Sequence, residues 1–380
     1  MDQTTENDPA RNADVRFYDN RQKYLMFVNA CNEKRVIAER VSRELSEIQP
    51  RPPAARIFDA GIGDGTVLSG LLRAMHCHFP TMPFYVVGKE ISLEDVRLTL
   101  DKVPDRMMEH PATVLVLTNM TYSEAPWLTP QKPENRERLV WHEVTLSRTC
   151  AYDFEQQITH LQPFLAENWQ SRTGKTGNPV YERPVVLVLF REDQKFLLDS
   201  VIPDRDALRA DYDLVIASQP YRARTSADSK ARKVIVPLSR ALRSGGRLIG
   251  IHSFGKDPGM EIVHAVWPDD DPFETDRLAV LDAVMQAMGP EAANFDFVAG
   301  SDARSVFRYD MHILPDETSR TIGTSTAFAA WNAAVYVAQI DDARLDKATL
   351  DGSYIDATQG ALRRHGGLWF NNESYVIARR

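Results

Sequence analysis

An acid followed by three alternating glycines is the pattern in this chain most able to bind a ligand. Asp59 ends a short apolar run, and Gly61, Gly63 and Gly65 follow it at every second position. Glycine lets a backbone turn at positive φ and lets a ligand come close to the peptide groups, because it has no Cβ. Apolar residues then recur at the 3.6-residue spacing of one helix face. The segment 56–75 therefore predicts a strand, a tight turn and a helix, an arrangement that binds nucleotides.

The spacing of the glycines bears on which nucleotide would bind. A dinucleotide fingerprint reads G-x-G-x-x-G and leaves bare amides for a pyrophosphate, whereas here the third glycine comes one residue early. Asp59 argues in the same direction, because a carboxylate at the strand end repels a pyrophosphate and suits an ammonium group. The pattern favours a ligand with a positively charged end over a diphosphate.

The stretch resembles motif I of the class I S-adenosylmethionine-dependent methyltransferases. This resemblance implies that Asp59 faces the amino end of the cofactor, S-adenosylmethionine, and that Gly61, Gly63 and Gly65 line its body. An ordinary βα turn that binds nothing is the alternative interpretation of a lone glycine-rich segment.

Two further apolar runs end in polar residues that suit the same ligand. Residues 84–88 read as a buried parallel strand, and Glu90 follows near the offset at which an acid takes the two ribose hydroxyls of a nucleoside. Residues 113–117 predict a third strand, and Asn119 lies where the resembling family often places a contact to adenine. The plainer interpretation of Glu90 is a solvated acid at the start of a helix.

A second chemical motif follows the predicted fourth strand, residues 212–217. It consists of Ser218, Gln219, Pro220 and Tyr221, which lie beside the glycine turn if the sheet is doubly wound. The stretch resembles motif IV of the same family, whose strand-end residues meet the transferred methyl group, and also the Asn/Asp/Ser-Pro-Pro-Tyr/Phe motif of amino-group methyltransferases. The resemblance favours transfer to nitrogen, but here a glutamine replaces the first proline of that motif. A simple closing turn is the alternative.

A third motif spans the end of a predicted helix and the predicted fifth strand that follows it. Residues 226–242 read as a helix stopped by two glycines, Gly245 and Gly246, before a strand at 247–251. His252 ends that strand and could accept a proton from a substrate, although a structural histidine is the alternative. The candidate catalytic residues are therefore Tyr221, Gln219 and His252, and Ser218 joins the cofactor-binding set.

The elements together predict an α/β fold with a doubly wound, mostly parallel seven-stranded sheet, the Rossmann-like fold of the resembling family. We expect a disordered tail at 1–15, an N-terminal helical segment at 16–50 and a methyltransferase domain at 51–380. An insertion at 121–205 precedes the fourth strand and would carry substrate specificity or the interface of a homodimer. Residues 366–377 read as two extended runs joined by an Asn-Asn turn.

The predicted helix over 17–45 lies ahead of the first strand. In the resembling family such a helix often covers the cofactor pocket, which makes Tyr18, Tyr24 and Lys34 candidates for lining the substrate entrance. A helix that only packs on the sheet is the alternative.

Composition restricts the partners and the compartment. The 380 residues are 43% hydrophobic and 26% charged, which is ordinary for a globular protein. With a net charge of −8 the chain lacks the basic field that attracts nucleic acid, so we do not expect a nucleic-acid partner. Three distant cysteines predict neither a disulfide framework nor a metal site. The sequence carries no signal peptide or apolar run of membrane length, which predicts a cytoplasmic protein without a membrane partner.

The resemblance implies an S-adenosylmethionine-dependent methyltransferase, and we expect a small-molecule acceptor, with an amine as one candidate. An RNA or protein methyltransferase is an alternative that would need a basic face near Tyr221, such as the cations within 222–233 could form. A non-catalytic regulatory protein that binds S-adenosylmethionine is a second alternative, and a nicotinamide-linked reductase is a third.

Overall fold

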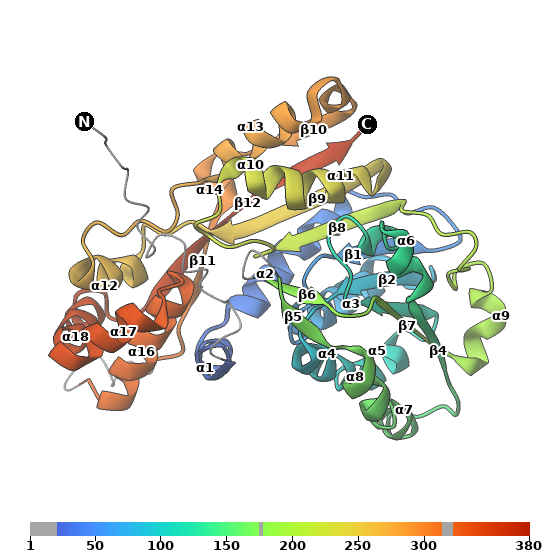
Figure 1. The fold of residues 1–380 in the computed structure, drawn as a ribbon, viewed down its shortest axis with the longest axis horizontal. Helices are drawn as coiled ribbons and strands as arrows, with labels where there is room; N and C mark the ends of the chain where they lie inside the picture. The colour runs from blue at the N-terminus through green and yellow to red at the C-terminus, as the bar shows by residue number, and fades with distance from the viewer. Residues whose placement is uncertain (1–20, 175–177, 314–321) are drawn as a thin grey trace, which may run out of the picture.

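The computed structural model describes residues 21–174, 178–313 and 322–380 (Figure 1). The predicted tail at 1–15 and Tyr18 lie outside these residues. The strands are β1 (Ala55–Asp59), β2 (Phe84–Lys89), β3 (Thr113–Thr118), β4 (Val140–Leu146), β5 (Ser171–Thr173), β6 (Pro179–Tyr181), β7 (Val185–Arg191), β8 (Tyr212–Ser218), β9 (Leu242–Ser253), β10 (Phe295–Val298), β11 (Val306–Asp310) and β12 (Trp369–Arg379).

Helices connect these strands and cover the sheet. The α-helices are α1 (Arg21–Ala30), α2 (Glu33–Ser42), α3 (Thr66–His78), α4 (Leu93–Leu100), α5 (Val103–Glu109), α6 (Pro133–Glu137), α7 (Ala151–Thr159), α8 (Gln162–Asn168), α9 (Lys195–Leu198), α10 (Ala227–Lys230), α11 (Val236–Arg240), α12 (Pro258–Val266), α13 (Arg277–Met288), α14 (Asp302–Ser305), α16 (Thr324–Val337), α17 (Asp342–Asp351) and α18 (Ser353–His365). Shorter turns are η2 (Arg43–Ser46), η3 (Ala125–Trp127), η4 (Glu192–Gln194), the π-turn η5 (Ala231–Ile235) and η6 (Gly289–Asn294). No described helix is both long and apolar enough to cross a bilayer.

The main sheet follows the order β10-β12-β9-β8-β1-β2-β3-β7-β4, with β11 paired to β12. The strands β3, β2, β1, β8 and β9 are parallel, and β12 runs antiparallel between β9 and β10. This confirms the predicted doubly wound α/β sheet. The order reverses between β1 and β8, and in doubly wound sheets ligands bind at that point. The described sheet has ten strands and not seven, because β7, β4 and β11 widen it.

The apolar strands form two cores, one on each face of the sheet. In β1 all five residues are buried, and alternate side chains point to opposite faces. Ile57 belongs to a core with residues of α2, α3 and α4, whereas Phe58 belongs to one with residues of η5 and α13. Burial on both faces explains why these strands read as continuous apolar runs. A third core joins α1, α12, α16 and α18 beside β11 (Figure 1).

The segment predicted as an insertion contributes strands at one edge of the sheet. Strand β7 pairs antiparallel with β3, and β4 pairs parallel with β7. Within this segment, α7 and α8 follow β4, and the short strands β5 and β6 pair antiparallel as a separate two-stranded sheet. The boundaries predicted for the domain and its insertion stay a prediction.

Three predicted elements differ from the structure. The helix over 17–45 breaks near Asn32 into α1 and α2. The helix over 226–242 ends at Arg240, and Gly246 lies inside β9, where an added Cβ would come 2.5 Å from the Tyr212 carbonyl oxygen. Its missing side chain therefore permits close strand packing and does not cap a helix. Residues 366–377 form no hairpin, because β12 is one strand whose neighbours are β9, β10 and β11.

Candidate functional site

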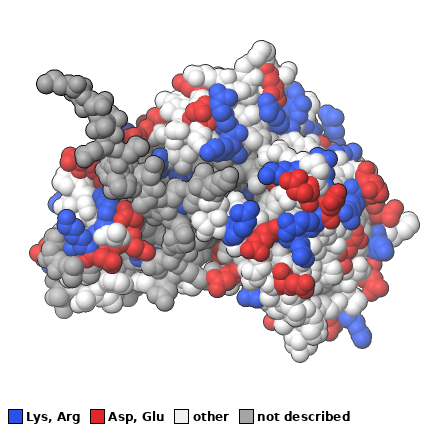
Figure 2. Space-filling view, viewed as in Figure 1, with Lys and Arg blue, Asp and Glu red and all other residues white. Residues whose placement is uncertain are grey.

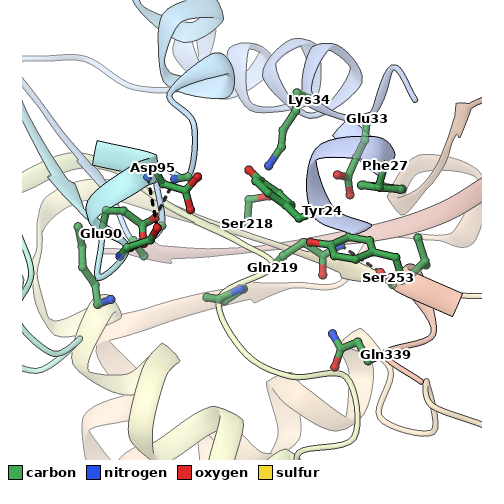
Figure 3. A pocket seen from close by; sticks show the side chains of 18 of the residues that line it. Tyr24, Phe27, Glu33, Lys34, Glu90, Asp95, Ser218, Gln219, Ser253 and Gln339 are labelled. Atoms are coloured by element: carbon green, nitrogen blue, oxygen red, sulfur yellow. Dashed lines mark hydrogen bonds between the residues drawn. The ribbon is translucent and has the colours of Figure 1, made fainter. Parts of the chain in front are cut away.

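A cavity of about 200 Å³ lies at the carboxyl ends of β1, β2 and β8 (Figure 3). Its walls come from the glycine turn, the end of β8, helices α1 and α2, and helix α16. Five of the predicted site residues line it: Gly61, Gly63, Glu90, Ser218 and Gln219. The others, Asp59, Gly65, Asn119, Tyr221 and His252, are not among the lining residues.

The glycine turn presents its backbone to the cavity. Gly63 has φ +52° and Gly65 has φ +76°, which side chains rarely adopt. An added Cβ at Gly65 would come 2.9 Å from Thr99 Cα, so the third glycine allows close packing on α4. Gly61 and Gly63 therefore remain the residues that could contact a ligand.

Asp59 lies directly behind the turn and is 1% exposed. One carboxylate oxygen, Oδ1, accepts a hydrogen bond from Gly61 N at 3.2 Å. The other, Oδ2, is buried and has no hydrogen-bond partner in the described part of the chain. Burial raises the pKa of Asp59 to about 6, against the effects of the Gly61 amide and Lys34. An unpartnered, buried carboxylate oxygen is costly unless a donor reaches it, so this atom marks a place for a cationic group.

Glu90 ties the turn to the end of β2. Its Oε2 accepts from Gly63 N at 3.0 Å, and its Oε1 accepts from Ile91 N at 2.7 Å and from Ser92 N at 2.9 Å. An ionised carboxylate has about four acceptor positions. Because three are used by the backbone, Glu90 can accept one further hydroxyl without releasing the turn.

Lys34 and Tyr24 reach the glycine turn from the N-terminal helices. An added Cβ at Gly63 would lie 3.4 Å from Tyr24 Oη and 3.8 Å from Lys34 Nζ. Lys34 forms no ion pair with another described residue. Burial works to lower the pKa of Lys34, but Tyr24 and the acids around the cavity outweigh it and raise the pKa. Lys34 is therefore a charged donor that could bind a ligand carboxylate.

Asn119 follows β3 but faces the insertion. Its Nδ2 donates to Arg183 O at 2.9 Å, and its Oδ1 accepts from Val185 N at 2.9 Å. Both ends of the amide thus hold the start of β7. The contact to adenine that we predicted for Asn119 is not favoured by this geometry and stays untested.

Replacing Asn119 by alanine separates the two roles. We expect a loss of about 1–3 kcal/mol in the free energy of unfolding, because Val185 N would be left buried without an acceptor, together with unchanged cofactor affinity. Urea denaturation and calorimetric titration measure the two effects. Weakened cofactor binding at unchanged stability would instead support the adenine contact.

The end of β8 carries a strained residue into the cavity. Gln219 has φ +47°, unusual for a residue with a side chain. Its backbone N donates to Ile251 O at 2.8 Å, and its Nε2 lies 3.1 Å from Ser253 Oγ and 3.3 Å from Asn372 Oδ1. Strained backbone conformations of this kind cluster at functional sites. The observed strain supports a role for Gln219 in positioning a ligand.

Tyr221 and His252 lie behind this wall in a buried chain of hydrogen bonds. Tyr221 Oη is 2.6 Å from His252 Nδ1, and His252 Nε2 is 2.7 Å from Glu373 Oε1. Arg277 Nη1 donates to Glu373 Oε2 at 2.7 Å. Burial raises the pKa of Tyr221 well above its ordinary value. The structure brings the two predicted residues together but turns them toward the core, so their catalytic role stays a prediction.

Several lining residues were not predicted as site residues from the sequence. They include Phe27, Glu33, Asp95 and Tyr336. Glu33 carries no local signal, because an acid in the first turn of a helix is common. Tyr24 and Lys34, which we predicted as entrance residues, do line the cavity.

Comparison with known proteins gives distant likenesses only. No protein-family model matches the chain, and no curated protein is significantly similar. Among solved structures, geranyl diphosphate methyltransferase in complex with S-adenosylmethionine is 11% identical, with 98% of this chain and 95% of that chain covered and a TM-score of 0.32. A putative sarcosine dimethylglycine methyltransferase from Galdieria sulphuraria is 10% identical, with 91% and 84% covered and a TM-score of 0.32.

The rRNA methyltransferase AviRa from Streptomyces viridochromogenes is 12% identical, with 57% of this chain and 73% of that chain covered and a TM-score of 0.23. Likenesses this distant do not define an activity. The fold assignment depends on the strand order of the chain itself, which is a doubly wound, Rossmann-like arrangement.

Proposed function

We propose that the protein is an S-adenosylmethionine-dependent methyltransferase with a small-molecule acceptor. The observation that carries this proposal is the pair of charges at the glycine turn. Asp59 offers a buried carboxylate oxygen without a partner, and Lys34 offers an ammonium group without an ion pair in the described residues. One anion and one cation suit the amino-acid end of S-adenosylmethionine, which carries both an ammonium and a carboxylate group. A pyrophosphate would instead meet the Asp59 charge.

The remaining residues have roles that follow from their positions. Gly61 and Gly63 let the ligand approach the backbone, and the free acceptor position of Glu90 suits a ribose hydroxyl. When bound, S-adenosylmethionine would supply a methyl group on a positively charged sulfur. The carbon–sulfur bond would break and leave its electrons on sulfur, while a lone pair of the acceptor forms the new bond to the methyl carbon. Ser218 and Gln219 would hold the acceptor in line with that methyl. Most of the rate would come from positioning and from exclusion of water.

The distribution of basic residues favours a small molecule over RNA. Three cations of the segment 222–233 are already engaged: Arg224 pairs with Asp270 at 2.6 Å, Arg232 pairs with Asp228 at 2.6 Å, and Lys230 Nζ donates to Ala223 O at 2.8 Å. On the face shown in Figure 2, Lys and Arg are interspersed with Asp and Glu. Nucleic-acid binding depends on a field of one sign, and this face offers none.

Transfer of a labelled methyl group tests the proposal. The protein is incubated with methyl-labelled S-adenosylmethionine and fractionated cell extract, and the fractions are then counted. We expect label in the small-molecule fraction. Label in RNA or protein would overturn the acceptor class. Absence of label despite measured cofactor binding would favour the non-catalytic alternative.

A further inference from the structure

The two ends of the cavity differ in chemistry. Figure 3 shows Glu90 and Asp95 at one end, near the glycine turn, and Glu33 and Phe27 at the other. The glycine end has the groups that suit S-adenosylmethionine. The opposite end, which we call the Glu33 end, consists of Glu33, Phe27 and the two lining tyrosines whose rings lie against Phe27, Tyr309 and Tyr336.

We propose that the Glu33 end binds the acceptor as an ammonium ion and that Glu33 accepts its proton, so that the acceptor is an amine with at least one N–H bond in its protonated form. This inference rests on the proposed function and extends it to the substrate class and to a further catalytic residue. Four observations carry it: the burial of Glu33, its lack of a cationic partner, an unpartnered tyrosine hydroxyl and the aromatic wall.

Glu33 is a buried acid that faces the cavity. Its exposed fraction is 6%, and it forms no ion pair with another described residue. It lies in the first turn of α2, where the helix dipole favours a negative charge. Burial raises the pKa of Glu33, while Lys34 and the amides of Asn372 and Gln219 oppose the shift. A buried carboxylate is costly without a cationic partner, and an ammonium ion in the cavity would supply one.

Tyr309 supplies the independent indication of a ligand. Its hydroxyl oxygen is buried, has no hydrogen-bond partner among the described residues and belongs to a side chain that lines the cavity. Nearly all buried polar groups in proteins are hydrogen-bonded. The unpartnered hydroxyl at the same end as Glu33 therefore marks a place for a polar group of the acceptor.

Aromatic rings complete the Glu33 end. Phe27 stacks on Tyr336 with ring centroids 4.7 Å apart and meets Tyr309 edge-on at 6.1 Å. The faces of such rings attract cations through their quadrupoles. Four carboxylates and two lysines line the whole cavity, so its charge also favours a cationic acceptor over a carboxylate or a phosphate.

The proton step balances without another reactant. The N–H bond of the bound ammonium breaks, the proton moves to a Glu33 oxygen, and the bonding electrons remain on nitrogen as a lone pair. That lone pair is the nucleophile of the methyl transfer described above. The buried setting of Glu33 helps, because it brings the proton affinity of the carboxylate closer to that of an amine.

Binding of matched probes tests the inference without turnover. The protein is saturated with S-adenosylhomocysteine and titrated calorimetrically with n-butylamine and 2-phenylethylamine, and with 1-butanol and 2-phenylethanol as neutral counterparts. Of the two amines, we expect the one that binds more tightly to have an affinity about tenfold or more above that of its matching alcohol, the scale of one charge-assisted hydrogen bond.

The variant Glu33→Gln should lose this preference and still bind S-adenosylhomocysteine as tightly as the wild type. Glu39→Gln, an exposed acid on the same helix, is the matched control and should keep it. Tyr309→Phe, which removes only the hydroxyl, should weaken amine binding about threefold to tenfold.

Three results would contradict these expectations. Equal binding of amines and alcohols by the wild type, or an undiminished preference in Glu33→Gln, would overturn the amine assignment while the proposed function stands. Failure of the wild type to bind S-adenosylhomocysteine would overturn the proposed function itself, and the amine assignment with it.

Discussion

Replacement of Asp59 by asparagine is expected to weaken S-adenosylmethionine binding by an order of magnitude or more. The side chain keeps its shape but loses the charge that would meet the ligand ammonium, and a charge-assisted hydrogen bond contributes about 1.5–3 kcal/mol. Calorimetric titration at pH 7.5 measures the change. Asp64→Asn is the matched control, because Asp64 belongs to the same turn but both of its carboxylate oxygens already accept hydrogen bonds from Thr66. An unchanged affinity in Asp59→Asn would remove Asp59 from the site.

The pH dependence of binding gives a second test of Asp59. Burial raises its pKa to about 6, so the carboxylate takes up a proton as the pH falls through that value and loses the charge that attracts an ammonium group. We expect the affinity of the wild type to fall between pH 7.5 and pH 5, by up to about tenfold per pH unit below the pKa. In Asp59→Asn this part of the pH dependence should be absent. A parallel fall in both proteins would mean that another group is responsible.

Replacement of Glu373 by glutamine is expected to lower the free energy of unfolding by about 3–5 kcal/mol, the cost of removing one partner of a buried ion pair. Glu373 has no exposed surface and lies between Arg277 and His252, each at 2.7 Å. The substitution would leave the buried charge of Arg277 without this partner. Urea denaturation at pH 7 measures the loss. Asp296→Asn, which breaks an exposed pair with Arg380, should give no measurable change.

The Glu373 network also predicts acid sensitivity. Burial acts to raise the pKa of Glu373, but His252 and Arg277 outweigh it and lower the pKa. A carboxyl group with a lowered pKa stabilises the folded state above its unfolded pKa, and that stability is lost as the pH falls through the folded value. The stability of the wild type should therefore fall below about pH 4.5 more steeply than that of Glu373→Gln. Equal slopes would contradict the role of this carboxylate.

The central strands could be predicted from the sequence because their burial is a local property. Strand β1 and strand β8 are covered on both faces, so each contains consecutive apolar residues, Ile57–Phe58 in β1 and Leu214–Ala217 in β8. The C-terminal strand could not be predicted in this way. Asn371 and Asn372 have the composition of a turn, but they pair with β11, and Asn372 also pairs with Ser253 of β9. These pairings depend on residues far away in the chain.

The candidate site also contains some residues that could be predicted from the sequence and others that could not. Gly61, Gly63 and Glu90 were predicted as cofactor-binding residues because they belong to short motifs next to strands, and the structure places them on one cavity. Glu33 and Tyr309 reach that cavity from a helix before the sheet and from the strand β11. Neither belongs to a local motif, and only the folded chain brings the two together. Gly65 and Asn119 are motif residues that do not line the cavity: Gly65 lies against Thr99, and the amide of Asn119 hydrogen-bonds to Arg183 and Val185.

A crystal structure with S-adenosylmethionine tests the central claim most directly. We expect the ligand in the cavity above the glycine turn, with its ammonium group within hydrogen-bonding distance of Asp59, its carboxylate near Lys34 and a ribose hydroxyl on Glu90. A cavity that stays empty at saturating ligand, or that is filled by the protein's own side chains, would contradict it.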